Sequence, residues 1–142
     1  MPVPSLCRMS SPGMVTVLVA DPHPGLPGAI TAALETQPGI AVAGSADRLA
    51  DAVAAIRCDR PDVVLLDLAV LAGRGLAGLG ELTAVRRSTA VLVMGVVEDR
   101  ARTREAIRAG AAGRVLKHAP AAELGAAVRS AGARGRRLRV VR

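Results

Sequence analysis

Two acidic residues and one lysine each follow a short apolar run in this 142-residue chain. Asp21 follows VTVLVA, Asp67 follows VVLL, and Lys117 follows Val115 and Leu116. Two carboxylates that lie close together repel each other unless a proton or a cation separates them. Mg²⁺ prefers hard oxygen ligands of this kind, and a lysine ammonium can stabilise charge on a phosphoryl group. These residue types therefore predict phosphoryl chemistry, in which an ionised aspartate acts as a nucleophile and forms an aspartyl phosphate.

Lys117 is the only lysine in the chain, and the other 18 basic residues are arginine. A compact ammonium fits a phosphoryl oxygen in a narrow site better than the wide guanidinium of arginine does. The single lysine falls at the end of an apolar run, where it would face two acids. This placement favours a functional role for Lys117 over a solvated side chain.

Apolar runs alternate with amphipathic segments along the chain and predict five strand–helix units. Short runs rich in β-branched residues are typical of strands buried in a parallel sheet, and each is followed by a helical period bounded by Gly or Pro. The expected strands are Val15–Ala20, Ile40–Ala43, Val63–Leu66, Val91–Met94 and Val115–Leu116, and the last expected helix is Ala121–Ala131. Parallel strands need crossover helices, so the pattern predicts an α/β fold with a three-layer α/β/α doubly wound sheet. Ligands of such sheets bind beyond the carboxyl ends of the strands, and the order 2-1-3-4-5 would place Asp21 beside Asp67.

The composition indicates one globular domain without aromatic residues, since 51% of the residues are hydrophobic and none is Phe, Trp or Tyr. Six arginines and no acid occur from Arg129 onwards, so most of the net charge of +7 belongs to this end. We expect a loose extension over residues 1–13, with Met14 as an alternative start, a folded domain over 14–132, and a disordered basic tail over 133–142.

The two cysteines and the first residues of the chain indicate the cellular compartment. Cys7 and Cys58 lack the spacing of metal ligands, and we expect two free thiols in a reducing cytoplasm. The start of the chain resembles no secretory signal, and no apolar stretch reaches the roughly 20 residues of a membrane helix. These features predict a cytoplasmic protein.

Three blocks of the sequence resemble the receiver domains of bacterial two-component response regulators, especially the subfamily that usually carries a helix-turn-helix output domain. Residues 17–24 (VLVADPHP) resemble the motif of the first strand, and residues 61–68 (PDVVLLDL) resemble the phosphoacceptor motif. Residues 106–124 (AIRAGAAGRVLKHAPAAEL) are similar to the family segment around the site lysine. The match covers about residues 15–131 and identifies the folded domain as receiver-like, with a flavodoxin-like fold.

The resemblance implies a role for each residue that it aligns. Asp67 would be the phosphoacceptor, and Lys117 would contact the phosphoryl group. Asp21, Asp67 and the backbone carbonyl of Ala69 would be the protein ligands of Mg²⁺.

Four departures from the family pattern identify an atypical, degenerate receiver, and one of them is the loop after the phosphoacceptor, which reads Val70-Leu71-Ala72 in place of Met-Pro-Gly. Pro22 replaces a second acid, which weakens the expected Mg²⁺ binding. Gly95 replaces a Thr or Ser whose hydroxyl contacts the phosphoryl group, and Arg114 replaces an aromatic switch residue. Because a ligand shifts an equilibrium only through contacts that differ between two states, we expect an impaired switch. His23 is expected to be a loop residue rather than a ligand, and His118 to be solvated.

These observations predict a stand-alone receiver domain of a phosphorelay, phosphorylated on Asp67 by a histidine kinase or a phosphotransfer protein. Such a domain is a substrate rather than an enzyme, and a dehalogenase-like hydrolase would need an acid where Ala69 stands. The alternative is a pseudo-receiver that is not phosphorylated and acts as an interaction or dimerisation module, with a homodimer through the fourth-helix/fifth-helix face. Nucleic acid is not expected as a partner, because no residues follow that could form an output domain and aromatics for base stacking are absent.

Overall fold

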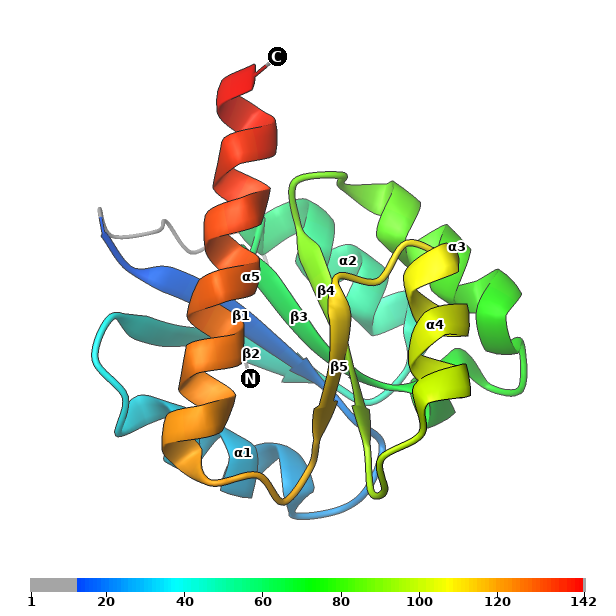
Figure 1. Ribbon diagram of the computed structural model, residues 1–142, viewed down its shortest axis with the longest axis horizontal. Helices are drawn as coiled ribbons and strands as arrows, with labels where there is room; N and C mark the ends of the chain where they lie inside the picture. The colour runs from blue at the N-terminus through cyan, green and yellow to red at the C-terminus, as the bar shows by residue number, and fades with distance from the viewer. Residues whose placement is uncertain (1–12, 142) are drawn as a thin grey trace.

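The computed structural model of the protein describes the backbone of residues 13–141 and the side chains of residues 13–134. Within this part of the chain, five parallel strands form one sheet in the order β2-β1-β3-β4-β5 (Figure 1). The strands are β1 (Val15–Ala20), β2 (Ile40–Ala46), β3 (Val63–Asp67), β4 (Ala90–Gly95) and β5 (Gly113–Leu116). The helices are α1 (Leu26–Glu35), α2 (Leu49–Asp59), α3 (Gly75–Val85), α4 (Arg100–Arg108) and α5 (Ala121–Val141), with a 3₁₀ turn η1 (Leu68–Leu71) after β3. The predicted fold class and strand order are confirmed.

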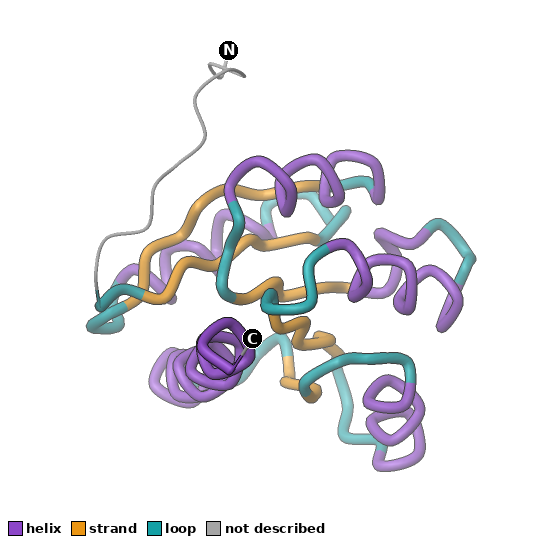
Figure 2. Tube along the Cα trace, turned by 90° about the horizontal axis from the view of Figure 1, so that it is seen from above, coloured by secondary structure: helices purple, strands orange, loops and turns teal. Residues whose placement is uncertain are grey.

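The helices cover the two faces of the sheet as separate layers (Figures 1 and 2). Alternate residues of each strand point to opposite faces, so each strand contributes to two hydrophobic cores. In β3, Val64 and Leu66 pack in one core with α2, α3 and α4, whereas Val63 and Leu65 pack in the other with α1 and α5. Each fully buried Leu or Val stabilises the fold by roughly 1.5–3 kcal/mol.

The last helix extends further than the sequence predicts. We expected Gly132 to end it and residues 133–142 to form a disordered tail, but α5 continues to Val141 and projects beyond the sheet (Figure 1). Gly132 instead allows α5 to pack closely on β1, because a Cβ built at this position would lie 2.8 Å from Cγ1 of Val15. Alanine, arginine and leucine on both sides are strong helix formers, so a single glycine does not stop the helix. The predicted extension over residues 1–13 lies almost wholly outside the described residues and stays a prediction.

The structure also bears on the expected state of the cysteines. Cys58 is disulfide-bonded, so the expectation of a free thiol is wrong for this residue. Sequence spacing gives no information on whether two cysteines approach within bonding distance.

Among the described helices, none combines the length and the apolar character that crossing a membrane requires.

Candidate functional site

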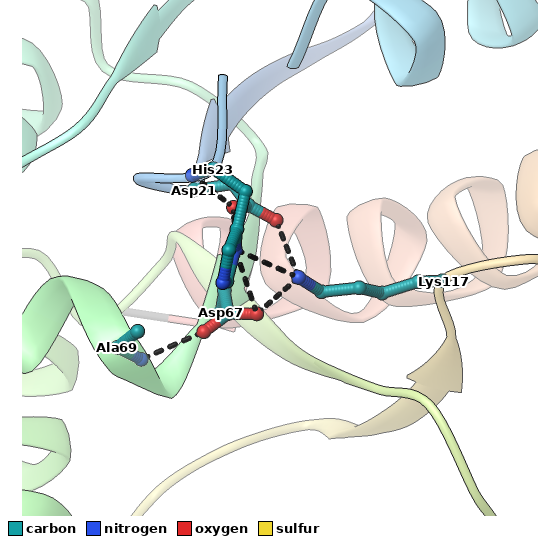
Figure 3. A network of polar contacts seen from close by, with 5 residues as sticks. All are labelled: Asp21, His23, Asp67, Ala69 and Lys117. Atoms are coloured by element: carbon teal, nitrogen blue, oxygen red, sulfur yellow. Dashed lines mark hydrogen bonds and ion pairs between the residues drawn. The ribbon is translucent and has the colours of Figure 1, made fainter. Parts of the chain in front are cut away.

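The carboxyl ends of three strands bring Asp21, Asp67 and Lys117 together (Figure 3). Asp67 is the last residue of β3, and Asp21 directly follows β1, the neighbouring strand. The backbone N–H of Lys117 donates to the carbonyl of Gly95 at 2.8 Å, which continues the ladder between β4 and β5 and aims the side chain at the two acids. The convergence predicted from the strand ends is present in the structure.

The carboxylate of Asp67 is held through both oxygens. Its Oδ1 accepts a hydrogen bond from the backbone N–H of Ala69 at 2.7 Å, because Asp67 caps the 3₁₀ turn that follows β3. Its Oδ2 forms a short ion pair with Nζ of Lys117. The side chain is 15% exposed, so an incoming group can reach a carboxylate whose orientation is already fixed.

Asp21 is the buried acid of the site, and its side chain has no exposed surface. Its Oδ1 accepts a hydrogen bond from the backbone N–H of His23 at 2.8 Å. Its Oδ2 is paired with the ammonium of Lys117, whose Nζ lies 2.8 Å away, and no other described residue donates to this oxygen. Burial alone would raise the pKa of Asp21, but the contacts with Lys117 and His23 outweigh burial and lower the pKa below its ordinary value.

Lys117 is the cation at the centre of the site, with a side chain that is 10% exposed. Burial favours the neutral amine, but the carboxylates of Asp21 and Asp67 favour the ammonium more strongly and raise the pKa of Lys117. Lys117 therefore carries a full positive charge beside Asp67 over the whole physiological pH range. This charge can stabilise the oxygens of a transferring phosphoryl group.

His23 lies in the site, where the sequence predicted only a loop residue. The Asp21 side chain accepts from the His23 backbone two residues on, and this local turn folds the ring back toward the acids. Nδ1 of His23 lies 2.6 Å from Oδ1 of Asp21, 3.3 Å from Nζ of Lys117 and 3.8 Å from Oδ2 of Asp67. The spacing Asp-x-His could have indicated this turn. His118, by contrast, is exposed as expected.

Three side chains of the site offer ligand atoms to a divalent cation. Asp21, His23 and Asp67 each offer one ligand atom, and these atoms lie within 4.8 Å of one another. The buried Oδ2 of Asp21, whose one described polar contact is the ammonium of Lys117, is a carboxylate oxygen of the kind that a hard cation prefers. The carbonyl of Ala69 accepts from the N–H of Ala72 at 3.2 Å and keeps a second lone pair. The carboxylates of Asp21 and Asp67 fit Mg²⁺, which prefers oxygen to the imidazole nitrogen of His23, although Pro22 adds no carboxylate.

Gly95 and Arg114, which the sequence singled out separately, are in contact. A Cβ built on Gly95 would lie 1.9 Å from Nη2 of Arg114. Val93 pairs with Arg114 in the ladder between β4 and β5, so Gly95, two residues on, presents the same face of the sheet. Both line a pocket of about 460 Å³ that also includes Asp67 and Lys117. The register could have predicted this contact, but only once the two strands had been aligned.

Residues 17–129 match the sequence family described as the response regulator receiver domain. A five-stranded α/β sheet with two acids and a lysine at its carboxyl edge defines the same class of protein. The chain belongs to the response regulator receiver domain family, which comprises the receiver domains of two-component response regulators.

Two curated relatives and one solved structure illustrate the similarity. The response regulator UvrY of Escherichia coli K12 is 34% identical over 120 residues, covering 82% of this chain and 54% of UvrY. The DNA-binding transcriptional activator DevR/DosR of Mycobacterium tuberculosis is 32% identical over 120 residues, covering 84% of this chain and 55% of that protein. The chain thus spans about half the length of these relatives. The signal receiver domain of NarL from M. tuberculosis superposes with a TM-score of 0.76 at 30% identity, over 85% of this chain and 98% of that domain.

Proposed function

We propose that this chain accepts a phosphoryl group on Asp67 from a histidine kinase or a phosphotransfer protein in a cytoplasmic two-component phosphorelay. The observation that carries the proposal is the arrangement around Asp67. Its carboxylate is oriented by the N–H of Ala69, paired with the ammonium of Lys117, and open to a pocket. Membership of the receiver family supports the same reading.

In the proposed reaction, a carboxylate oxygen of Asp67 attacks the phosphorus of a phosphohistidine on the donor. The new O–P bond forms as the P–N bond breaks, and the donor imidazole keeps the electron pair and later takes up a proton from water. The N–H of Ala69 holds the carboxylate in place, and Lys117 stabilises negative charge on the transferring oxygens. The chain is then a phosphoryl acceptor rather than an enzyme.

Mg²⁺ is the cofactor that the donor set supports. Asp21, Asp67 and the carbonyl of Ala69 would hold it, and the proximity of the two carboxylates, whose ligand atoms lie within 4.8 Å of one another, supports this assignment. When bound, Mg²⁺ neutralises charge on phosphoryl oxygens. Because Pro22 contributes no carboxylate, we expect weaker binding than two adjacent acids would give.

We also propose that the usual switch of the family is impaired. Gly95 has no hydroxyl to contact a phosphoryl group, and Arg114 has no aromatic ring to change position. A phosphoryl group shifts the structure only through contacts that differ between two states.

Intact-mass measurement tests this function directly. The protein is incubated with Mg²⁺ and acetyl phosphate, and the wild type is expected to gain the mass of one phosphoryl group. Asp67→Asn is expected to gain none, whereas Asp51→Asn, which changes an exposed acid of α2, should behave like the wild type. The proposal fails if the wild type gains no mass, and the site assignment fails if Asp67→Asn still does.

A second candidate is an interaction module that needs no phosphorylation. Val96, Val97 and Ile107 are large hydrophobic residues with exposures of 64%, 63% and 50%, and they lie next to or on α4. Such a surface favours a homodimer or a docked partner on the side of the domain formed by α4 and α5. Sedimentation of the protein without a phosphodonor tests it, because a dimer that Val97→Asp and Ile107→Asp dissociate would support this candidate and a monomer would oppose it.

A further inference from the structure

The guanidinium of Arg114 occupies the space that a side chain at position 95 would fill. A Cβ on Gly95 would lie 1.9 Å from Nη2, 2.4 Å from Cζ and 2.9 Å from Nε of Arg114. Contacts below 3.0 Å would force either Arg114 or the backbone to move. The φ of Gly95 is not positive, so its backbone conformation is open to any residue. A side chain at position 95 would therefore displace the guanidinium of Arg114, a cation that now occupies this space.

Most N–H donors of the Arg114 guanidinium have no acceptor among the described residues. Nη1 of Arg114 donates to the backbone carbonyl of Val97 at 2.6 Å. Within the described part of the chain, Nη2 and Nε have no hydrogen-bond acceptor, and no carboxylate lies within ion-pair distance of Arg114. A guanidinium carries five N–H donors in a planar fork that matches the oxygens of a phosphoryl group. Arg114 thus reaches the phosphoacceptor pocket with most of its donors available.

We propose that Arg114 is the phosphoryl-binding residue that replaces the hydroxyl missing at position 95. Its guanidinium donates to the oxygens of a phosphoryl group on Asp67 and leaves the carbonyl of Val97. This inference rests on the proposed phosphorylation of Asp67. It assigns the switch to a guanidinium, where the family pattern would use a hydroxyl and an aromatic ring.

The direction of this exchange follows from the strengths of the two hydrogen bonds. Before phosphorylation, Arg114 ties β5 to the loop after β4 through a neutral carbonyl. A phosphoryl group carries about −1.5 to −2 charges and three strong acceptor oxygens, so it adds a Coulomb attraction for the guanidinium that the neutral carbonyl of Val97 does not supply. Arg114 therefore makes different contacts in the two states, which is what a switch requires. The segment released is the exposed Val96–Asp99 loop that leads into α4.

Nitrogen-detected NMR of the arginine side chains tests the proposal on the wild type. The Nε–Hε signal of Arg114, assigned by its loss in Arg114→Lys, is expected to shift on phosphorylation. Arg48 is the matched control, because it is 78% exposed, pairs with Asp51 of α2 and does not line this pocket, so its signal should stay. A phosphorylated protein with an unmoved Arg114 signal overturns this inference alone. A protein that gains no phosphoryl mass overturns the proposed function as well.

Variants at positions 114 and 95 test separately the charge of the guanidinium and the space at Gly95 that it occupies. The affinity for beryllium fluoride with Mg²⁺, a non-covalent stand-in for the phosphoryl group, is expected to fall roughly tenfold or more in Arg114→Leu. Gly95→Ala should lose a similar factor, because its Cβ displaces the guanidinium and supplies no donor. Gly95→Ser also displaces it but adds a hydroxyl, so affinity should recover in part. Equal affinities for Arg114→Leu, Gly95→Ala and the wild type would overturn the proposal.

Discussion

Nζ of Lys117 lies 2.8 Å from Oδ2 of Asp21, an acid whose side chain is fully buried. Both pKa values move in the direction that favours the charged pair, downward for Asp21 and upward for Lys117. The pair is therefore a structural element of the fold as well as a part of the candidate site.

Removal of the lysine charge should destabilise the fold. Lys117→Met leaves a buried carboxylate without its cation, and we expect a loss of about 3 kcal/mol, at the low end for a buried pair because Lys117 reaches solvent. Urea denaturation measures the change. Arg48→Met, which breaks the exposed pair with Asp51, should cost only about 0–1 kcal/mol. Equal losses in the two variants would show that the Lys117 pair contributes no more than a surface pair.

The pH dependence of stability should carry the signature of this pair. The folded pKa of Asp21 lies below its unfolded value near 3.8, so its contribution is present above that pH and is lost as the pH falls through the folded pKa. The folded pKa of Lys117 lies above 10.5, so its contribution is present below that pH and is lost as the pH rises through the folded pKa. Urea midpoints across pH should fall at both ends, and Asp21→Asn should reduce the acid-side slope. An unchanged acid-side slope in Asp21→Asn would contradict this account.

The packing of α5 on β1 should make Gly132 intolerant of substitution. A Cβ at position 132 would meet Cγ1 of the buried Val15 at 2.8 Å, and overpacking of this kind costs about 1–3 kcal/mol. Gly80 in α3 is the matched control, because the nearest atom to its Cβ is a carbonyl oxygen 3.9 Å away. Thermal melts should show Gly132→Ala destabilised and Gly80→Ala stabilised by up to about 1 kcal/mol from helix propensity. The packing role is refuted if Gly132→Ala is the more stable variant.

The start of α4 should depend on one capping residue. Oδ1 of Asp99 accepts a hydrogen bond from the N–H of Arg102 at 3.1 Å, which satisfies an N–H group at the first turn. Asp99→Ala should cost about 1 kcal/mol and increase hydrogen exchange in the first turn of α4, whereas Asp99→Asn should retain most of the cap. Faster exchange spread evenly over all helices would argue against a local cap.

The strands and the candidate site could be predicted because both depend on local patterns. The run VTVLVA gives β1 as Val15–Ala20 in both the sequence and the structure, and the acids at the ends of β1 and β3 meet because parallel strands end at one edge. The end of α5 could not be predicted in this way. Gly132 looks like a stop signal, and only its contact with Val15 reveals its packing role.

The contacts of His23 and Arg114 escaped prediction for a different reason. Each depends on the direction in which a long or flexible side chain turns. The ring of His23 is drawn toward Asp21 by a local turn, and the guanidinium of Arg114 enters a gap on the neighbouring strand. A residue-by-residue comparison with a family pattern records Gly95 and Arg114 as two separate departures. In the structure the two are linked, because the guanidinium of Arg114 occupies the space that a side chain at Gly95 would need.

The two cores packed without a single aromatic ring have an optical consequence. With no Trp, Tyr or Phe in the chain, the protein has no intrinsic fluorophore. A tryptophan at Val97, which is 63% exposed and whose carbonyl accepts from Arg114, would emit against a dark background. Its emission wavelength and quenching would then report movement of the loop after β4 directly, in the intact protein and in real time.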